Sequence, residues 1–259
     1  MPGGRCVVAT WNLWGGNAPG TYTRERGIAR GALPGSPASR EDDPVHAWKC
    51  RAPLLVAELA RIGADVVALQ ENTRQPDGRS CAAELADRLG MHVCEDDHPR
   101  GLAVLSRSPV VAARRLQLGV ETFDYPPPLV VELDAGARRL TFVTFHLPLG
   151  RSGDRAPVVR ELANAVGSLE PPLLVCGDLN APPGDPVVED LLSAGLTDAS
   201  AAAGNTMPNP EPRVRLDYVL VGAGGLEVGV RGAATLGHRA DPLGFLPSDH
   251  LGVVVELDL

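Results

Sequence analysis

Polar side chains that can bind cations or move protons stand beside apolar runs at several places in this chain. They are Asn12, Glu71, His146, Asp178, Asn180, Asp217, Asp249 and His250. Ligand sites in sheet proteins gather where strands leave the hydrophobic layer, so we expect these side chains to converge. Each residue alone is more typical of a strand-end hydrogen bond, a helix cap, an ion pair or a turn. Only the complete set indicates a site.

The set combines carboxylates and carboxamides with two histidines. Carboxylate and amide oxygens suit a hard cation, Mg²⁺ or Mn²⁺, better than thiols do. The histidines add proton transfer and hydrogen bonds to a negatively charged substrate oxygen. This combination indicates hydrolysis of a phosphoester by an in-line water.

The segment LLVCGDLNAPPGD, residues 173–185, carries two of these side chains. Its apolar run predicts a buried strand, and Gly177 lets the chain leave that strand while closely packed. Because side chains alternate along an extended chain, the two-residue spacing points Asp178 and Asn180 to the same side. Asp185 then caps the following helix.

The elements that must position the set are apolar strands and amphipathic helices. Eight apolar runs predict strands at 6–13, 65–70, 101–106, 129–133, 140–147, 173–179, 216–221 and 251–257. Helical patterns lie at 54–62, 81–89, 186–194 and near 157–169. Several strands are apolar at alternating positions on both faces, which predicts sheets covered on both sides. Because some strands also follow one another directly, mixed sheets are favoured over a purely parallel fold.

Length and composition bound the domain count and the class of partner. The 259 residues favour one domain, 1–259, with a long loop insertion at about 15–47 and a second loop at 200–213. The formal net charge is −8 and no run of basic residues appears. A protein that binds mainly by neutralising phosphates usually carries a basic stripe, so nucleic acid is a less favoured partner than a small phosphorylated compound.

The cysteine pattern and the N-terminus predict the compartment. The chain has five widely spaced cysteines and no C-x-x-C. This pattern is typical of reduced thiols in a cytoplasmic protein. No signal-peptide pattern and no stretch approaching about 18 apolar residues appears, so we expect no membrane insertion. No feature indicates an obligate protein partner.

Seven motifs together resemble the endonuclease/exonuclease/phosphatase superfamily, a metal-dependent group that includes deoxyribonuclease. They occur in the family's order between residues 6 and 257: TWNL, DVVALQE, GLAVLSRSP, VTFHLP, LLVCGDLNAPPGD, RLDYVL and PSDHLGVVVEL. The resemblance implies a four-layered αββα sandwich, an α/β fold with two mixed β-sheets packed face to face and helices outside. It also implies one site at the top of the sheets.

The resemblance further implies a metal centre and its residues. By this similarity Asn12 and Glu71 are ligands of the principal Mg²⁺, and Asp249 is a further carboxylate on the metal side. The arginine often found two residues after the metal-binding glutamate is Thr73 here, with Arg74 one place later.

The same resemblance implies the catalytic roles. Asp178 orients or deprotonates the attacking water, and Asn180 holds the phosphate or a metal. His250 contacts the scissile phosphate while Asp217 bonds its other ring nitrogen, fixes its tautomer and favours its charge. His146 resembles the acid near the leaving group in the deoxyribonuclease, sphingomyelinase and phosphatase branches, which disfavours abasic-site repair.

Two features remain open. An upstream acid commonly braces the equivalent of His146, and the chain offers Glu95, Asp96 and Asp97 in a stretch that a solvated loop explains equally well. The 15–47 insertion follows Asn12 directly, and its polar side chains could cover a substrate or belong to an exposed loop. They are Tyr22, Arg24, Arg26 and Arg30.

Three functions compete on this sequence. The leading hypothesis is a metal-dependent phosphoester hydrolase for a small or soluble phosphorylated substrate. The second is a deoxyribonuclease-like endonuclease or phosphodiesterase that uses the same residues on nucleic acid. The third is a repurposed non-hydrolytic or binding protein in specialised metabolism. The two histidines argue against a binding module, which need not keep both, and leave open a new reaction with the same metal.

Overall fold

The structure, a computed structural model, describes residues 4–16, 31–120, 125–136, 139–150, 152–224 and 228–259. The helices within these residues are η1 (Trp14–Gly16), η2 (Pro37–Arg40), α1 (Pro44–Ile62), α2 (Cys81–Leu89), α3 (Ser152–Gly167) and α4 (Pro186–Ser193). In this described part of the chain, no helix is long and apolar enough to span a membrane.

In the described residues the strands form two six-stranded mixed sheets, which we call the first and the second sheet. The first sheet has the order β11 (Gly229–Leu236), β12 (Gly252–Asp258), β1 (Arg5–Asn12), β2 (Val66–Asn72), β4 (Gly101–Ser106) and β3 (His92–Glu95). The second has the order β5 (Val110–Arg115), β6 (Leu129–Asp134), β7 (Arg139–His146), β8 (Leu173–Asp178), β10 (Asp217–Gly222) and β9 (Thr197–Asp198).

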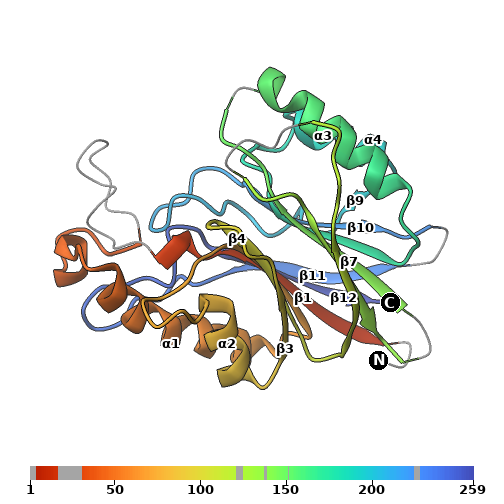
Figure 1. The fold of residues 1–259 in the computed structure, drawn as a ribbon. Helices are drawn as coiled ribbons and strands as arrows, with labels where there is room; N and C mark the ends of the chain where they lie inside the picture. Colours follow the sequence, from red (N-terminus) through yellow and green to blue (C-terminus); the bar gives the residue numbers. More distant parts are fainter. Residues whose placement is uncertain (1–3, 17–30, 121–124, 137–138, 151, 225–227) are drawn as a thin grey trace.

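Three hydrophobic cores hold these sheets in four layers. One core joins the facing sides of the two sheets, with Val8 and Val104 from the first and Phe142 and Cys176 from the second. A second core packs the outer side of the first sheet on α1 and α2, and a third packs the second sheet on α3 and α4. Figure 1 shows the two helix pairs on opposite outer sides of the paired sheets. The expected αββα sandwich is confirmed.

Strand direction brings the site-bearing strand ends to one edge of the sandwich. β1 runs parallel to β2, and β7 runs parallel to β8, so each pair ends at the same edge of its sheet. β10 and β12 run antiparallel to β8 and β1, so their starts lie at that edge as well. Parallel pairing thus gathers residues that are far apart in the sequence.

All eight strands expected from apolar runs are present, with small shifts at their ends. Four further strands were not predicted from the sequence: β3, β5, β9 and β11. Each of them lies at the outer edge of its sheet. Their side chains are mostly exposed or half-buried, so they lack the continuous apolar pattern that identifies a buried strand.

The first long helix corrects two sequence predictions. The helix expected at 54–62 begins at Pro44, where the Asp43 side chain accepts a hydrogen bond from Val45 N. Pro53 lies inside this helix, although proline in a helix interior usually kinks or ends it. The loop expected at about 15–47 therefore ends before Pro44. Its polar residues Tyr22, Arg24, Arg26 and Arg30 lie outside the described residues.

Candidate active site

Three of the expected side chains form one row across the second sheet. His146 pairs in register with Asp178 on β8, and Asp178 pairs with Asp217 on β10. All three are buried. His146 Nε2 lies 3.5 Å from Asp178 Oδ2. Since neighbours in register point to the same face of a sheet, the backbone pairing itself brings these side chains together.

Gly177 makes this row compact. A Cβ atom at Gly177 would lie 2.1 Å from the backbone oxygen of Phe145 on the neighbouring strand. No side chain fits there without moving the backbone, so glycine is required for the close approach of β8 to β7. This agrees with the close packing expected from the sequence at this position.

Asn12 and Glu71 come from the first sheet and face the row across the gap between the sheets. Asn12 Nδ2 donates to Asp178 Oδ2 at 3.1 Å and to Glu71 Oε1 at 3.4 Å. Glu71 has a left-handed backbone with φ of 55°, at the point where the β2–β4 register shifts. A non-glycine residue in this region is strained, and such strain concentrates at functional sites.

Asp249 and His250 lie on the loop before β12, and long-range hydrogen bonds hold this loop in place. Ser248 Oγ donates to the backbone oxygen of Asn12 at 2.7 Å, and Trp11 Nε1 donates to the backbone oxygen of His250 at 3.0 Å. The loop is thereby tied to the end of β1.

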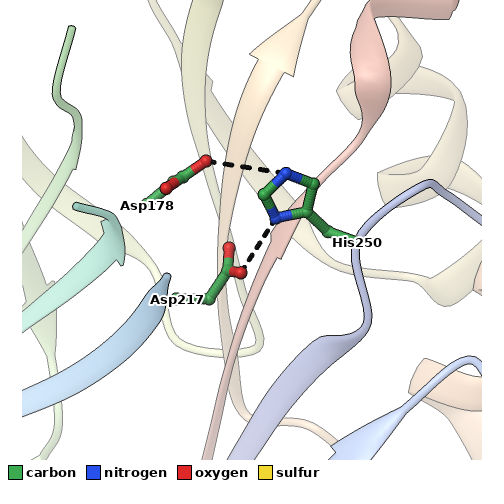
Figure 2. Close-up of side chains that lie close together, drawn as sticks. All are labelled: Asp178, Asp217 and His250. Carbon is green, nitrogen blue, oxygen red and sulfur yellow. Dashed lines mark hydrogen bonds and ion pairs between the residues drawn. The ribbon is translucent and has the colours of Figure 1, made fainter. Parts of the chain in front are cut away.

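His250 is held between two carboxylates (Figure 2). Its Nδ1 hydrogen-bonds Asp217 Oδ2 at 2.9 Å, and its Nε2 lies 3.8 Å from Asp178 Oδ2. Burial opposes a charge on the ring, but the charge of Asp217 and its hydrogen bond outweigh burial and raise the pKa of His250 to about 10. His250 is therefore a buried imidazolium at neutral pH, and Asp217 holds the proton on its Nδ1.

Asp178 stands at the centre of the site. Burial and the neighbouring charge of Asp217 raise its pKa, while the two histidines act in the opposite direction. A carboxylate with a raised pKa is a better proton acceptor than an exposed aspartate. Asn180 N donates to Asp178 Oδ1 at 2.8 Å and fixes the orientation of this carboxyl group.

His146 differs from His250 in its charge. Burial lowers its pKa, although the Asp178 charge opposes this effect. Asn180 Nδ2 lies 3.2 Å from His146 Nε2 and donates to the backbone oxygen of Leu147 at 2.8 Å. The Tyr125 ring packs edge-on against the His146 ring, with centroids 4.7 Å apart. His146 is thus a neutral ring whose Nε2 faces Asn180 and Asp178.

No acid of the 95–97 segment braces His146 within the part of the chain that the structure describes. His146 Nδ1 has no hydrogen-bond partner there. Glu95 accepts from Asn72 Nδ2 at 3.0 Å, Asp96 accepts from His98 N at 3.0 Å, and Asp97 pairs with Arg115. None of the three acids therefore braces His146 in these residues; Glu95 ends β3 and Asp96 is buried, so a solvated loop describes only Asp97.

Two groups of side chains have the chemistry to hold a metal ion. The ligand atoms of Asp178, Asp217 and His250 all lie within 4.8 Å of one another, close enough for a shared ion. However, the charged His250 ring repels a cation, and its Nδ1 is already bonded to Asp217. The oxygens of Glu71 and Asp178 converge on Asn12 Nδ2 instead, so carboxylates of both sheets face one point. This all-oxygen donor set fits a hard divalent cation.

Two buried arginines at the site were missed by the sequence analysis. Arg51 in α1 donates from Nε to the backbone oxygen of Pro247 at 3.0 Å and from Nη2 to that of Leu13. Arg155 in α3 donates from Nη1 to the backbone oxygens of Leu179 at 3.0 Å and Asn180 at 2.6 Å. Each guanidinium ties down a loop that carries or borders site residues.

The sequence held one signal for Arg51. It lies three residues after Trp48 and four before Leu55, which are both buried on the inner face of α1. A charged residue on the apolar stripe of a helix needs buried partners, so this spacing marks Arg51 as structural. The same signal marks Arg155, which lies three residues before Val158, four before Val159 and seven before Leu162, all buried on α3.

Comparison with known proteins supports this architecture. A family model described as Endonuclease/Exonuclease/phosphatase family matches residues 9–250. No curated protein sequence matches the chain. A humanized D. rerio TDP2 structure is 18% identical, with TM-score 0.74, and the alignment covers 98% of this chain and 99% of that chain.

Two further solved structures share the fold. The 3′ phosphatase NExo from Neisseria, bound to a product DNA hairpin, is 16% identical with TM-score 0.68, and 98% of this chain and 100% of that chain are covered. ANGEL2, a 2′,3′-cyclic phosphatase in complex with adenosine-2′,3′-vanadate, is 14% identical with TM-score 0.70, at 98% and 95% coverage. At these identities the likeness concerns the fold.

Proposed function

The chain belongs to the endonuclease/exonuclease/phosphatase family and is a phosphoester hydrolase of that family, and from this premise we propose that it cleaves a small or soluble phosphorylated substrate with a divalent metal ion. The observation that carries the proposal is the central position of Asp178. Its carboxyl group meets Asn12 and His250, which come from the first sheet and its loop, and His146 from the second sheet.

The residues of the second sheet supply the proton transfers. Asp178 accepts a proton from the attacking water, because its raised pKa favours proton uptake. As the water oxygen bonds to phosphorus, the bond from phosphorus to the leaving oxygen breaks. The charged His250 donates a hydrogen bond to a phosphate oxygen and stabilises its negative charge, while Asp217 keeps the ring protonated.

His146 and Asn180 act on the phosphate and the leaving group. The acid role of His146 requires a proton at Nε2, and the Asp178 charge 3.5 Å away favours that proton. Asn180 Nδ2, held near both His146 Nε2 and the backbone oxygen of Leu147, presents an amide to the same region. Together they face the oxygens of a bound phosphoester.

Asn12, Glu71 and Asp249 are the residues that we propose to hold Mg²⁺ or Mn²⁺. When bound, the ion supplies Lewis-acid stabilisation of negative charge on phosphate oxygens. Asn12 would contribute its amide oxygen if its side chain rotated, because Nδ2 now donates to Glu71 and Asp178 while Oδ1 accepts from Trp14 N at 2.9 Å. Amide orientations of this kind follow the hydrogen-bond network and change with a ligand.

The charge of the chain supports a small substrate. A net charge of −8 disfavours long polyanions and leaves a compact phosphorylated compound as the better partner. The alternative is a nuclease or phosphodiesterase, which has support from a specific observation, since D. rerio TDP2 with single-strand DNA product has TM-score 0.73 to this chain. The free cysteines also support a cytoplasmic location.

The test is turnover of generic phosphoesters by the purified protein. We expect release of p-nitrophenol from p-nitrophenyl phosphate or bis-p-nitrophenyl phosphate with Mg²⁺ or Mn²⁺, and none with EDTA. Nicking of supercoiled plasmid at low protein concentration, lost in His250→Ala, would favour the nuclease. Inactivity toward a broad phosphoester panel with either metal contradicts the hydrolase, and calorimetric metal binding without turnover then indicates a repurposed enzyme.

A further inference from the structure

A second basic group stands at the edge of the site, on the His146 side. Arg100 directly precedes β4 and is exposed to solvent. Its guanidinium carbon lies 5.6 Å from the centroid of the Tyr125 ring, and that ring packs edge-on against His146. One aromatic ring thus separates an exposed guanidinium from a histidine of the candidate site.

Among the described residues, no acidic side chain forms an ion pair with Arg100. The neighbouring acids are taken by other arginines, since Glu95 lies 3.6 Å from Arg74 Nη2 and Asp97 pairs with Arg115. No carboxylate pairs with the Arg100 guanidinium in the part of the chain that the structure describes. In those residues its guanidinium contacts the Tyr125 ring, and its charge helps burial to lower the pKa of His146.

The Tyr125 ring favours one place for this guanidinium. Tyr125 is buried, and its hydroxyl accepts a hydrogen bond from Leu149 N at 3.3 Å. A guanidinium over an aromatic face gains about 0.5–1 kcal/mol at an exposed site, which favours this position of the side chain without immobilising it. The N–H groups of Arg100 keep their capacity for bidentate bonds to an oxyanion.

The position of Arg100 matters because Arg74 is turned away from the site. The loop after the metal-binding glutamate offers Arg74, which donates to the backbone oxygen of Gly78 at 3.1 Å and pairs with Glu95. Among the described arginines, Arg100 is the one that contacts the aromatic neighbour of His146. The exposed positive charge on the His146 side of the site therefore comes from the β3–β4 connection.

We propose that Arg100, held by Tyr125, binds a second phosphate of the substrate, distinct from the phosphate that is cleaved. The proposal rests on the proposed function, since it places this second phosphate on the His146 side of the scissile one. The substrate class is a compound with two separate phosphate groups. A small bisphosphate and the flanking phosphodiester of a nucleic-acid strand share this chemistry.

Two nucleotides that differ only in the second phosphate test the proposal. Thymidine 3′-monophosphate and thymidine 3′,5′-bisphosphate are titrated with Mg²⁺ against protein carrying Asp178→Asn, so that binding is measured by calorimetry without turnover. We expect the bisphosphate to bind about tenfold more tightly, as a charge-assisted hydrogen-bonded pair allows. Adding Arg100→Met should bring the ratio of the two affinities close to one, and Arg100→Lys should restore part of it.

Arg139→Met is the matched control. Arg139 starts β7 at the end opposite to His146 and pairs with Glu132 at 3.0 Å, so its loss should leave the affinity ratio unchanged. A ratio that Arg100→Met does not alter overturns the proposal. An equal loss of affinity for both nucleotides also overturns it, because Arg100 would then act on the shared phosphate.

A third titration distinguishes a small bisphosphate from a nucleic-acid strand as the compound that carries the second phosphate. A single-stranded oligonucleotide with a 3′-phosphate is titrated under the same conditions. Tighter binding of the oligonucleotide than of the bisphosphate, dependent on Arg100, assigns the subsite to a strand, and equal affinity assigns it to a small bisphosphate. Because binding is measured without turnover, an Arg100-dependent ratio in a protein that hydrolyses nothing separates failure of the proposed function from failure of this subsite.

Discussion

The two sheets bring their site residues to the same edge by different means. In the second sheet His146, Asp178 and Asp217 lie within strands, so strand register aligns them. In the first sheet Asn12 ends β1, but Asp249 and His250 lie on a loop that depends on distant hydrogen bonds. The second sheet therefore positions its proton-transfer residues through its backbone ladder, whereas the first sheet positions Asn12 and Glu71 at strand ends and Asp249 and His250 on a tied loop.

The buried arginines follow the same division. Arg51 joins the segment after β1 to the segment before His250, while Arg155 supports the turn after β8. Burial lowers the pKa of Arg51 to about 10, so the guanidinium stays charged at neutral pH. The comparison predicts different effects of substitutions in the two sheets. Substitutions in the second sheet should lower kcat, and substitutions in the first sheet should weaken metal binding.

The largest effect is expected for Asp178→Asn in the second sheet. The amide cannot accept the proton of the attacking water, so kcat should fall by several orders of magnitude, about 10³-fold or more, and excess Mg²⁺ should not restore it. The fold should stay intact, because the side chains have the same shape. Steady-state kinetics across Mg²⁺ concentrations, with urea unfolding as the control, measure both quantities. Activity near that of the wild type would show that the role of Asp178 is wrong.

The next effect concerns the charge of His250. The folded-state pKa is about 10, above the ordinary value of 6.5, so the ion pair stabilises the fold fully below pH 6.5. This stability is lost as pH rises through about 10. The free energy of unfolding of metal-free protein should therefore fall by a few kcal/mol between these limits, at about 1.4 kcal/mol per pKa unit as an upper bound.

His250→Gln is the control for this pH dependence. The variant has no titrating ring, so its unfolding free energy in EDTA should change less between pH 6.5 and 10 than that of the wild type. The two curves should approach each other at high pH. If the two unfolding curves run parallel over the whole interval, Asp217 does not hold His250 in its charged form. The description of His250 and Asp217 as a buried ion pair is then wrong.

Glu71→Ala probes the first sheet and should act through the metal. Removing one of the proposed carboxylate ligands should raise the Mg²⁺ concentration for half-maximal activity by about 100-fold, with a smaller change in kcat at saturating metal. A titration of activity with Mg²⁺ measures this shift. Activity that stays low at every Mg²⁺ concentration, as in Asp178→Asn, would contradict the division between the sheets.

The sequence predicts the buried strands that carry the site residues. β1, β2, β7 and β8 are apolar runs that end at polar residues. The expected extended chain from Asp178 to Asn180 is wrong, because β8 ends at Asp178 and Asn180 has a left-handed φ of 49°; a turn closed by Asn180 N and Asp178 Oδ1 brings both side chains to His146. The edge strands β3, β5, β9 and β11 are not predicted, because their exposed side chains do not give the apolar pattern of a buried strand. A single sequence carries no comparable signal for strands that half face water.

The sequence predicts the members of the site better than the supports of the site. Asn209, for example, lies in the expected loop at 200–213 and donates from Nδ2 to the backbone oxygens of Gly237 and Ser248 at 3.1 Å each. These ties join segments far apart in the chain, and no local spacing reveals them. The same holds for Arg155, whose partners follow β8. Such contacts depend on tertiary packing, which propensity and period do not encode.

The smallest effect is expected for conservative changes of the two buried arginines, and it separates the halves most directly. Lysine keeps the charge but has one donor nitrogen in place of the guanidinium fork, so Arg51→Lys leaves a backbone oxygen of Leu13 or Pro247 without its partner. The loop carrying Asp249 should loosen, and the Mg²⁺ requirement should rise about tenfold while kcat at saturating metal changes little.

Arg155→Lys is the matched change on the other side. It loosens the turn that holds Asn180, which contacts His146 and not the proposed metal ligands, so kcat should fall about tenfold with an unchanged Mg²⁺ requirement. Thermal unfolding of both variants checks that the loss of stability is similar, about 1–3 kcal/mol for a buried acceptor left unpaired. If both variants change kcat and the Mg²⁺ requirement in the same proportion, each arginine serves the site as a whole. The two buried arginines then do not support a division between a catalytic sheet and a metal-binding sheet.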